Sequence, residues 1–165
     1  MKKTTPKKLT TFLFYLILFL VPCNFAKHWP QNWSYVNGIL IDYLIPTLYL
    51  TDILILTLLA IWLLRSFKKF LFAFLIFGFC FLISKNIINQ PASLYKLAKI
   101  IELILFVFYI KNNINIKKDI KKIVNVLSLS IIWQSNLAIG QWLKQGSIFG
   151  YWFFGEQPYN TATLG

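Results

Sequence analysis

The stretch "PTLYLTDILILTLLAIWLL", residues 46–64, places one carboxylate, that of Asp52, inside a run of apolar side chains. An α-helix needs about 20 predominantly apolar residues to cross a bilayer. We interpret 46–64 as a span of this kind that begins at Pro46. Asp52 then lies about 9 Å along the helix axis, below the outer interface and short of the bilayer centre.

Two interpretations of Asp52 stay open. In the first, Asp52 caps a helix that begins at Ile53, and its carboxylate accepts hydrogen bonds from free backbone N–H groups. That helix would have about 12 residues before Arg65, or about 18 Å, too short for the hydrocarbon core. In the second, Asp52 faces a polar cavity that opens to the outer leaflet.

The composition favours a membrane protein over a soluble one. Of the 165 residues, 58% are hydrophobic and 18% aromatic, and only 13% are charged. The mean hydropathy of +0.63 is high for a soluble domain. The net charge is +12, but the cations form short clusters between apolar runs and do not cover a soluble face. We therefore expect membrane lipids, and no nucleic acid, as partners.

The apolar runs predict an all-α, multi-pass transmembrane helical bundle with about five spans, which forms a single domain over 1–165. The expected spans are 9–25, 46–64, 70–84, 94–110 and 123–143. The third is short and needs Lys69 and Lys85 to extend their ammonium groups to the two interfaces. The first also imitates a signal peptide with cleavage after Ala26.

The distribution of Lys and Arg predicts the orientation of these spans. With the N-terminus in the cytoplasm, 12 of the 17 Lys and Arg side chains fall inside and five outside. Cytoplasmic loops carry the excess of positive charge in membrane proteins. We therefore expect an N-in and C-out topology.

Three polar groups within the later spans are candidate substrate-binding residues. Glu102 follows Lys99 by three residues, so the two share a helix face and either pair locally or line a lipid-phosphate path. Gln134 and Gln141 belong to a stripe of polar or small residues at helical spacing. Its members are Ser130, Gln134, Ala138, Gln141 and Gln145. The stripe packs against other helices or lines a substrate groove.

Two aromatic segments outside the spans supply further candidates. They are "KHWPQNWSY" at 27–35, with Trp33, and "GYWFFGEQPY" at 150–159, with Glu156. Such side chains settle at headgroup depth as an aromatic belt. Alternatively, their faces stack on sugar rings while nearby carboxylates and amides bind hydroxyls.

Recognisable catalytic motifs are missing from the sequence. Cys23 and Cys80 are 57 positions apart and belong to no CxxC or Cys/His ligand pattern, so neither a disulfide framework nor a metal site is expected. There is no Gly-rich phosphate loop and no nucleophile, base and acid set. We expect no cofactor, and the catalytic residues stay unknown.

Two segments resemble the N-terminal region of bacterial O-antigen ligase and O-antigen polymerase-like membrane proteins. They are "GILIDYLIPTLYLTDILIL" at 38–56 and "WQSNLAIGQWLKQGSIFGYWFFGEQPYNTATLG" at 133–165. The resemblance implies a multi-pass inner-membrane glycosyltransferase. Such an enzyme transfers glycan from an undecaprenyl-diphosphate carrier to an acceptor sugar at the outer face, without a nucleotide sugar or an essential metal.

The same resemblance implies that basic residues engage the diphosphate and that an external loop in the later half of the family's chain holds the catalytic groups. The present sequence would then be the N-terminal part of a larger membrane protein, and no catalytic residue is carried over to it. Two alternatives stay open. One is a small transport or channel subunit whose polar groups line a solute path, and the other is a non-catalytic membrane scaffold.

Overall fold

The computed structural model describes residues 5–23, 25–64 and 89–149, and every structural statement below concerns these residues. Their helices are α1 (Thr5–Leu20), α2 (Leu50–Leu63), α4 (Gln90–Asn113) and α5 (Ile116–Lys144). Their strands are β1 (Ala26–His28), β2 (Tyr35–Val36), β3 (Ile39–Leu40) and β4 (Thr47–Tyr49). Short 3₁₀ turns occupy Asn32–Ser34 and Asp42–Leu44.

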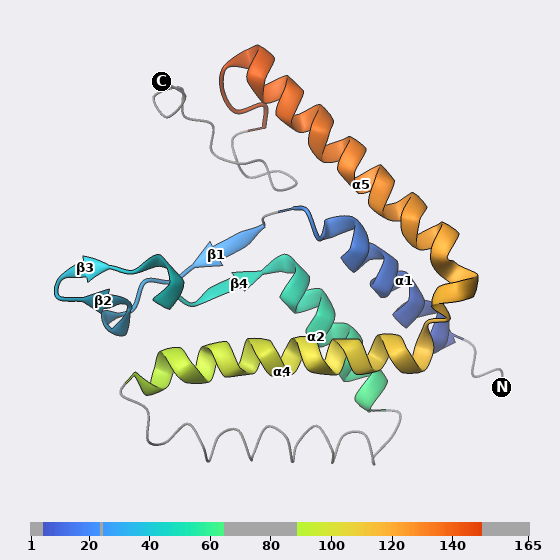
Figure 1. Ribbon diagram of the computed structural model, residues 1–165, viewed down its shortest axis with the longest axis horizontal. Helices are drawn as coiled ribbons and strands as arrows, with labels where there is room; N and C mark the ends of the chain where they lie inside the picture. The colour runs from blue at the N-terminus through green and yellow to red at the C-terminus, as the bar shows by residue number, and fades with distance from the viewer. Residues whose placement is uncertain (1–4, 24, 65–88, 150–165) are drawn as a thin grey trace.

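The first two helices are joined through a strand ladder. Strand β1 pairs antiparallel with β4, and Ala26 lies opposite Tyr49. The ladder continues toward the helices, because the Leu50 N–H donates to the Phe25 carbonyl at 2.9 Å. The units α1–β1 and β4–α2 therefore run side by side in opposite directions, and β2 and β3 project beyond the far end of the ladder (Figure 1).

The tip of this projection is a two-residue β-turn. Val36 pairs with Ile39, and Asn37 and Gly38 between them have φ angles of 50° and 80°. Two successive positive φ angles characterise the turn that joins tightly paired antiparallel strands, and Asn-Gly is its preferred sequence. No strand was predicted from the sequence, although "VNGI" at 36–39 carries this signal.

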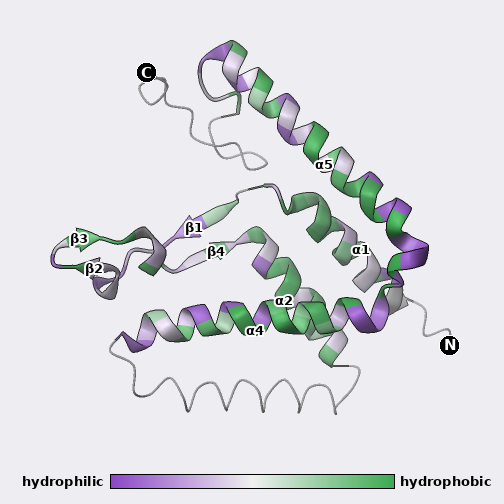
Figure 2. Ribbon diagram, viewed as in Figure 1, coloured by the Kyte–Doolittle hydropathy of each residue, from purple (hydrophilic) through white to green (hydrophobic). Residues whose placement is uncertain are grey.

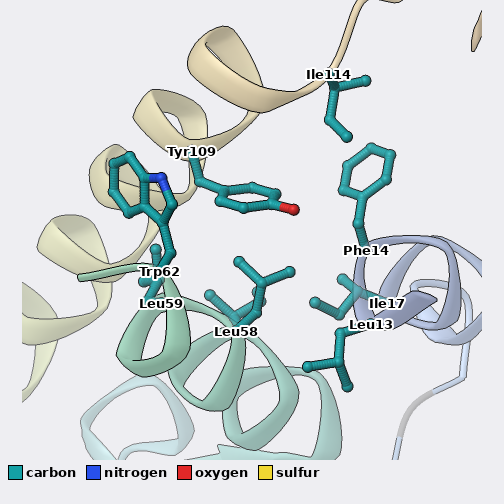
Figure 3. Packing of buried hydrophobic residues seen from close by; sticks show 9 residues of the cluster. Leu13, Phe14, Ile17, Leu58, Leu59, Trp62, Tyr109 and Ile114 are labelled. Carbon is teal, nitrogen blue, oxygen red and sulfur yellow. The ribbon is translucent and has the colours of Figure 1, made fainter. Parts of the chain in front are cut away.

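A hydrophobic core joins α1, α2 and α4. Side chains at helical spacing on α1 and α2 face each other, and the end of α4 closes the cluster (Figure 3). The Trp62 and Tyr109 rings meet edge to face, with centroids 5.7 Å apart. The buried members are Leu13, Phe14, Ile17, Ile55, Leu58, Leu59, Trp62, Tyr109 and Ile114.

The structure contradicts the predicted five-span bundle. The run 9–25 is helical only to Leu20 and is followed by a turn and β1, so it does not form one continuous helix. The run 46–64 is helical only from Leu50, because Thr47–Tyr49 are extended in β4. Helix α2 has 14 residues, or about 21 Å, which falls short of a hydrocarbon core of about 30 Å.

Within the described residues, α5 is the one helix that is long and apolar enough to cross a membrane. It has 29 residues and contains the predicted span 123–143. Helix α4 contains the predicted span 94–110 and is long enough at 24 residues, but Lys96, Lys99 and Glu102 make it too charged. The predicted span 70–84 lies outside the described residues. The part of the chain that the structure describes thus contains one candidate membrane helix, whereas four of the five expected spans fall within it.

Candidate functional site: a polar junction between α2 and α4

Asp52 is the third residue of α2 and is bonded back to the start of its own helix. The Tyr49 backbone N–H donates to the Asp52 carboxylate at 2.7 Å. A carboxylate in the first turn satisfies a free N–H group and complements the positive end of the helix dipole. This is a backbone contact of the kind that the capping interpretation expected, although the helix begins at Leu50 and not at Ile53.

Lys99 brings a positive charge from α4 to Asp52. Its ammonium group forms an ion pair with the Asp52 carboxylate, which is largely buried. The same ammonium lies 5.5 Å from the ring centroid of Tyr49 and 5.7 Å from that of Tyr95. Ring faces attract cations at this distance. The Lys99 charge is therefore held by one carboxylate and two aromatic rings.

Tyr95 fixes α4 against the strand ladder. Its hydroxyl donates to the Thr47 carbonyl at 2.7 Å and accepts from the Thr47 N–H at 3.1 Å. Thr47 also bonds through its own hydroxyl to Nδ1 of His28 at 2.8 Å. These bonds set the position of Tyr95 and Lys99, which are one helical turn apart on the same face of α4.

Glu102 lies on this face of α4 as well and is only 7% exposed. Its Oε1 atom is buried without a hydrogen-bond partner in the described part of the chain. The expected local ion pair between Lys99 and Glu102 is wrong, because Lys99 pairs with Asp52. A buried polar atom without a partner is costly, and such atoms are uncommon in folded proteins.

The environment of Glu102 raises the pKa of its carboxyl group. Burial, with a further contribution from the Asp52 charge, raises the pKa of Glu102 from 4.5 to about 7, and Lys99 partly offsets these effects. Glu102 lies on α4, outside the candidate membrane-spanning helix α5. We call Tyr49, Asp52, Tyr95, Lys99 and Glu102 together the polar junction.

The polar residues of α5 do not join the polar junction. The Ser130 hydroxyl donates to the Phe19 carbonyl of α1, and Nε2 of Gln134 lies 3.0 Å from the sulfur of Cys23. Gln141 is buried on the same face of α5. These contacts favour the packing interpretation of the stripe over the substrate groove.

The composition of the α5 stripe also differs from the prediction. Ala138 and Gln145 are exposed, whereas Leu137 is buried beside the polar members of the stripe. The buried face therefore follows Ser130, Gln134, Leu137 and Gln141.

The aromatic segment at 27–35 contacts the beginning of α4. The side chain of Asn89, which caps α4, donates to the Trp33 carbonyl at 3.2 Å. Further along, Lys96 lies 4.7 Å from the ring centroid of Tyr43. The backbone of Trp33 therefore helps to hold the start of α4 in place. Glu156, the other candidate from an aromatic segment, lies outside the described residues.

Sequence reasoning placed Asp52 and Glu102 among the candidates but did not bring them together, and it missed the roles of Tyr49, Tyr95 and Lys99. A local signal existed for α4, since Tyr95, Lys99 and Glu102 are spaced four and three residues apart on one face. The partnership of Lys99 with Asp52, 47 residues away, has no local signal.

The polar junction offers chemistry for binding polar groups. It combines an ammonium group, two carboxylates and two tyrosine rings, so it suits hydroxyl donors and anionic oxygens together. Within the described residues, no group of three or more His, Cys, Asp or Glu side chains is arranged to hold a metal ion. Comparisons with protein-family models, with curated proteins and with solved structures give no match to this chain.

Proposed function

We propose that the chain is the membrane-anchored part of a lipid-linked glycan ligase or polymerase of the bacterial inner membrane. In this proposal the polar junction contacts the headgroup of an undecaprenyl-diphosphate-linked glycan, and α5 supplies the anchor. The observation that carries the proposal is the buried Oε1 atom of Glu102, which has no hydrogen-bond partner within residues 5–23, 25–64 and 89–149 and lies beside the ion pair of Lys99 and Asp52.

The chemistry of such a headgroup matches the groups of the polar junction. A sugar hydroxyl can donate a hydrogen bond to Oε1 of Glu102. The Lys99 ammonium attracts the diphosphate. The faces of Tyr49 and Tyr95 offer apolar surface for the C–H groups of a sugar ring. One headgroup thus offers a partner to the carboxyl group, to the ammonium group and to the tyrosine rings.

The family resemblance supports the same assignment. Its first segment, 38–56, contains both Tyr49 and Asp52 of the polar junction. The resemblance also implies that basic residues engage the carrier diphosphate, and Lys99 is a basic residue held at the junction by Asp52. The transferase chemistry itself would belong to the family's external catalytic loop.

Glycan binding by the membrane-reconstituted protein tests the proposal. At pH 8, where Glu102 is ionised, a photoactivatable undecaprenyl-diphosphate oligosaccharide should label the wild-type chain, and Glu102→Gln should reduce labelling about tenfold because an uncharged amide oxygen is a weaker acceptor than a carboxylate. Asp119→Asn is the matched control, since Asp119 is a carboxylate that pairs with Lys122 on α5. Equal labelling of wild type and Glu102→Gln would remove the polar junction from substrate binding.

A second candidate function is a non-catalytic membrane scaffold, and the bonds of Asp52 favour it. Its carboxylate already bonds to Tyr49 and Lys99, so it joins α2 to α4 without a ligand. In a scaffold, Asp52→Asn would lower the free energy of unfolding, and no lipid-linked glycan would label the wild-type chain. Labelling of the wild type that Glu102→Gln abolishes excludes this candidate.

A further inference from the structure

Six exposed lysines lie at the end of the molecule opposite the strands. At this end α1 begins, α4 ends and α5 begins (Figure 1). We call these side chains the basic end. Its members are Lys8, Lys111, Lys117, Lys118, Lys121 and Lys122.

Packing between the helices brings these lysines together. The Tyr109 hydroxyl, from the last turns of α4, donates to the Thr10 carbonyl near the start of α1 at 3.2 Å. Ile114, in the link between α4 and α5, is buried in the core that contains Phe14 of α1 (Figure 3). The start of α1 and the link between α4 and α5 are therefore held side by side, although about 100 residues separate them.

The positive charge of the basic end is almost uncompensated. Among the described residues, its one acidic side chain is Asp119, which lies 3.7 Å from the ammonium of Lys122. Neighbouring ammonium groups repel one another and concentrate anions near the surface. The arrangement therefore calls for a negatively charged partner.

The neighbouring sequence identifies the kind of partner. The cluster of basic residues at the start of α5 ends at Lys122, and the apolar part of the helix follows immediately (Figure 2). Large apolar side chains along that part are exposed, so they suit contact with lipid. They are Val124, Leu129, Ile131, Ile132, Ile139, Trp142 and Leu143. When α5 crosses a bilayer, the lysines just before it lie at headgroup depth.

We propose that the basic end binds the anionic phospholipid headgroups of the leaflet in which α5 begins. Each lysine held near an anionic membrane surface contributes about 1 kcal/mol, or about a fivefold preference. The site differs from the polar junction, because Lys99 and Lys111 are about 18 Å apart along α4. Lipid binding at the basic end is therefore independent of the proposed glycan function.

Quenching by brominated lipids tests the proposal on the full chain in vesicles. A fluorophore is attached to a cysteine at Asn112, an exposed position in the last turn of α4, with Cys23 and Cys80 replaced by serine. The vesicles consist of phosphatidylcholine with either brominated phosphatidylglycerol or brominated phosphatidylcholine added. The ratio of the two quenching efficiencies measures the preference for the anionic lipid.

Two double variants with equal loss of charge separate the basic end from net charge. Lys117→Gln/Lys121→Gln removes two lysines one turn apart at the basic end. Lys27→Gln/Lys144→Gln removes two exposed lysines on β1 and at the far end of α5. We expect the first pair to lower the preference for phosphatidylglycerol about 25-fold and the second to leave it nearly unchanged. High salt should weaken the wild-type preference.

Three outcomes would overturn the proposal. The first is equal quenching of the wild type by the two lipids, and the second is an equal loss of preference in both double variants. The third is displacement of phosphatidylglycerol by a double-stranded oligonucleotide, which would assign the basic end to nucleic acid. Far-UV circular dichroism checks that both double variants keep the wild-type helix content, so that a loss of preference is not a loss of fold.

Discussion

Lys99 of α4 forms its ion pair with Asp52 of α2, 47 residues earlier in the chain, and leaves Oε1 of the nearby Glu102 without a partner among the described residues. The Lys99 ammonium thus contacts the Asp52 carboxylate directly and influences Glu102 only through its charge. Two carboxylates around one ammonium group give the polar junction an excess of negative charge whenever both are ionised.

Removal of the ammonium group should strongly destabilise the chain. In Lys99→Met the two carboxylates, both largely buried, face each other without a cation. Loss of one partner from a buried ion pair costs about 3 kcal/mol. Equilibrium unfolding in mixed micelles should show this decrease in the free energy of unfolding. Lys96→Met, which removes an exposed cation one turn earlier on α4, should cost less than about 1 kcal/mol. Equal losses would show that the ion pair with Asp52 is unimportant.

Stability should fall as the pH rises from about 4.5 to about 7. The pKa of Glu102 is raised from 4.5 to about 7 in the folded chain by burial and by the Asp52 charge, against the opposing effect of Lys99. Between these values the folded state binds more protons than the unfolded state, so a rise in pH favours unfolding. Unfolding curves measured across this range should show the decline in wild type. Glu102→Gln should flatten it, and a decline that persists unchanged would assign it to other groups.

The contact between α5 and α1 should depend on Ser130. Its hydroxyl is completely buried and donates to the Phe19 carbonyl, so Ser130→Ala leaves that carbonyl unsatisfied. We expect a loss of about 1 kcal/mol in the free energy of unfolding. Ser128→Ala is the matched control, because Ser128 is exposed on the same helix. Similar effects of the two substitutions would contradict the packing role of the stripe.

The β2–β3 turn should be sensitive to its backbone conformation alone. Gly38 has a φ of 80°, and a Cβ atom there would meet no other atom within 4 Å. Gly38→Ala therefore adds strain without a clash and should cost about 1 kcal/mol. Faster hydrogen exchange at the Val36 and Ile39 amides would report it. Asn37→Gly relieves a positive φ in the same turn, so its exchange should not accelerate.

Thiol labelling should show that the two ends of α5 lie on opposite sides of a membrane. The positive-inside rule predicts that a cysteine at Asn113 is shielded from an impermeant reagent added outside the cell. A cysteine at Lys144 should be labelled, because α5 is long enough to place it across the bilayer. Both experiments need a background without Cys23 and Cys80. Labelling of both positions, or of neither, would mean that α5 does not cross.

The sequence predicted the helical character of much of the chain, but it misplaced several helix ends. Apolar composition alone made 46–64 look like one helix, since Thr47, Leu48 and Tyr49 fit a membrane span as well as a strand. They become β4 because β1, 20 residues earlier, supplies a partner for their backbone. Strand pairing of this kind depends on residues that are distant in the sequence, so it cannot be predicted from a hydropathy profile. The NG turn at 37–38, in contrast, was a local signal that was overlooked.

The candidate site, like the fold, was only partly predictable from the sequence. Burial of charge pointed to Asp52 and Glu102, and both lie in the polar junction. Their arrangement was not predictable, because the local spacing of Lys99 and Glu102 favoured a pair that Asp52 prevents. The α5 stripe shows the opposite case. Its packing role followed from the cost of unpaired amides, and the contacts of Ser130 and Gln134 with residues 19 and 23 agree with it.

The contact of Ser130 with Phe19 spans 111 residues, and this separation has a consequence during synthesis. Ribosomes add about 5 to 20 residues per second. The ribosome therefore needs roughly 6 to 20 s after synthesis of the α1 surface to make the part of α5 that packs on it. The α1–α2 hairpin can close earlier, because its strands are close in sequence. During that interval the Phe19 carbonyl and the Cys23 thiol lack their α5 partners, Ser130 and Gln134, and are accessible to other molecules.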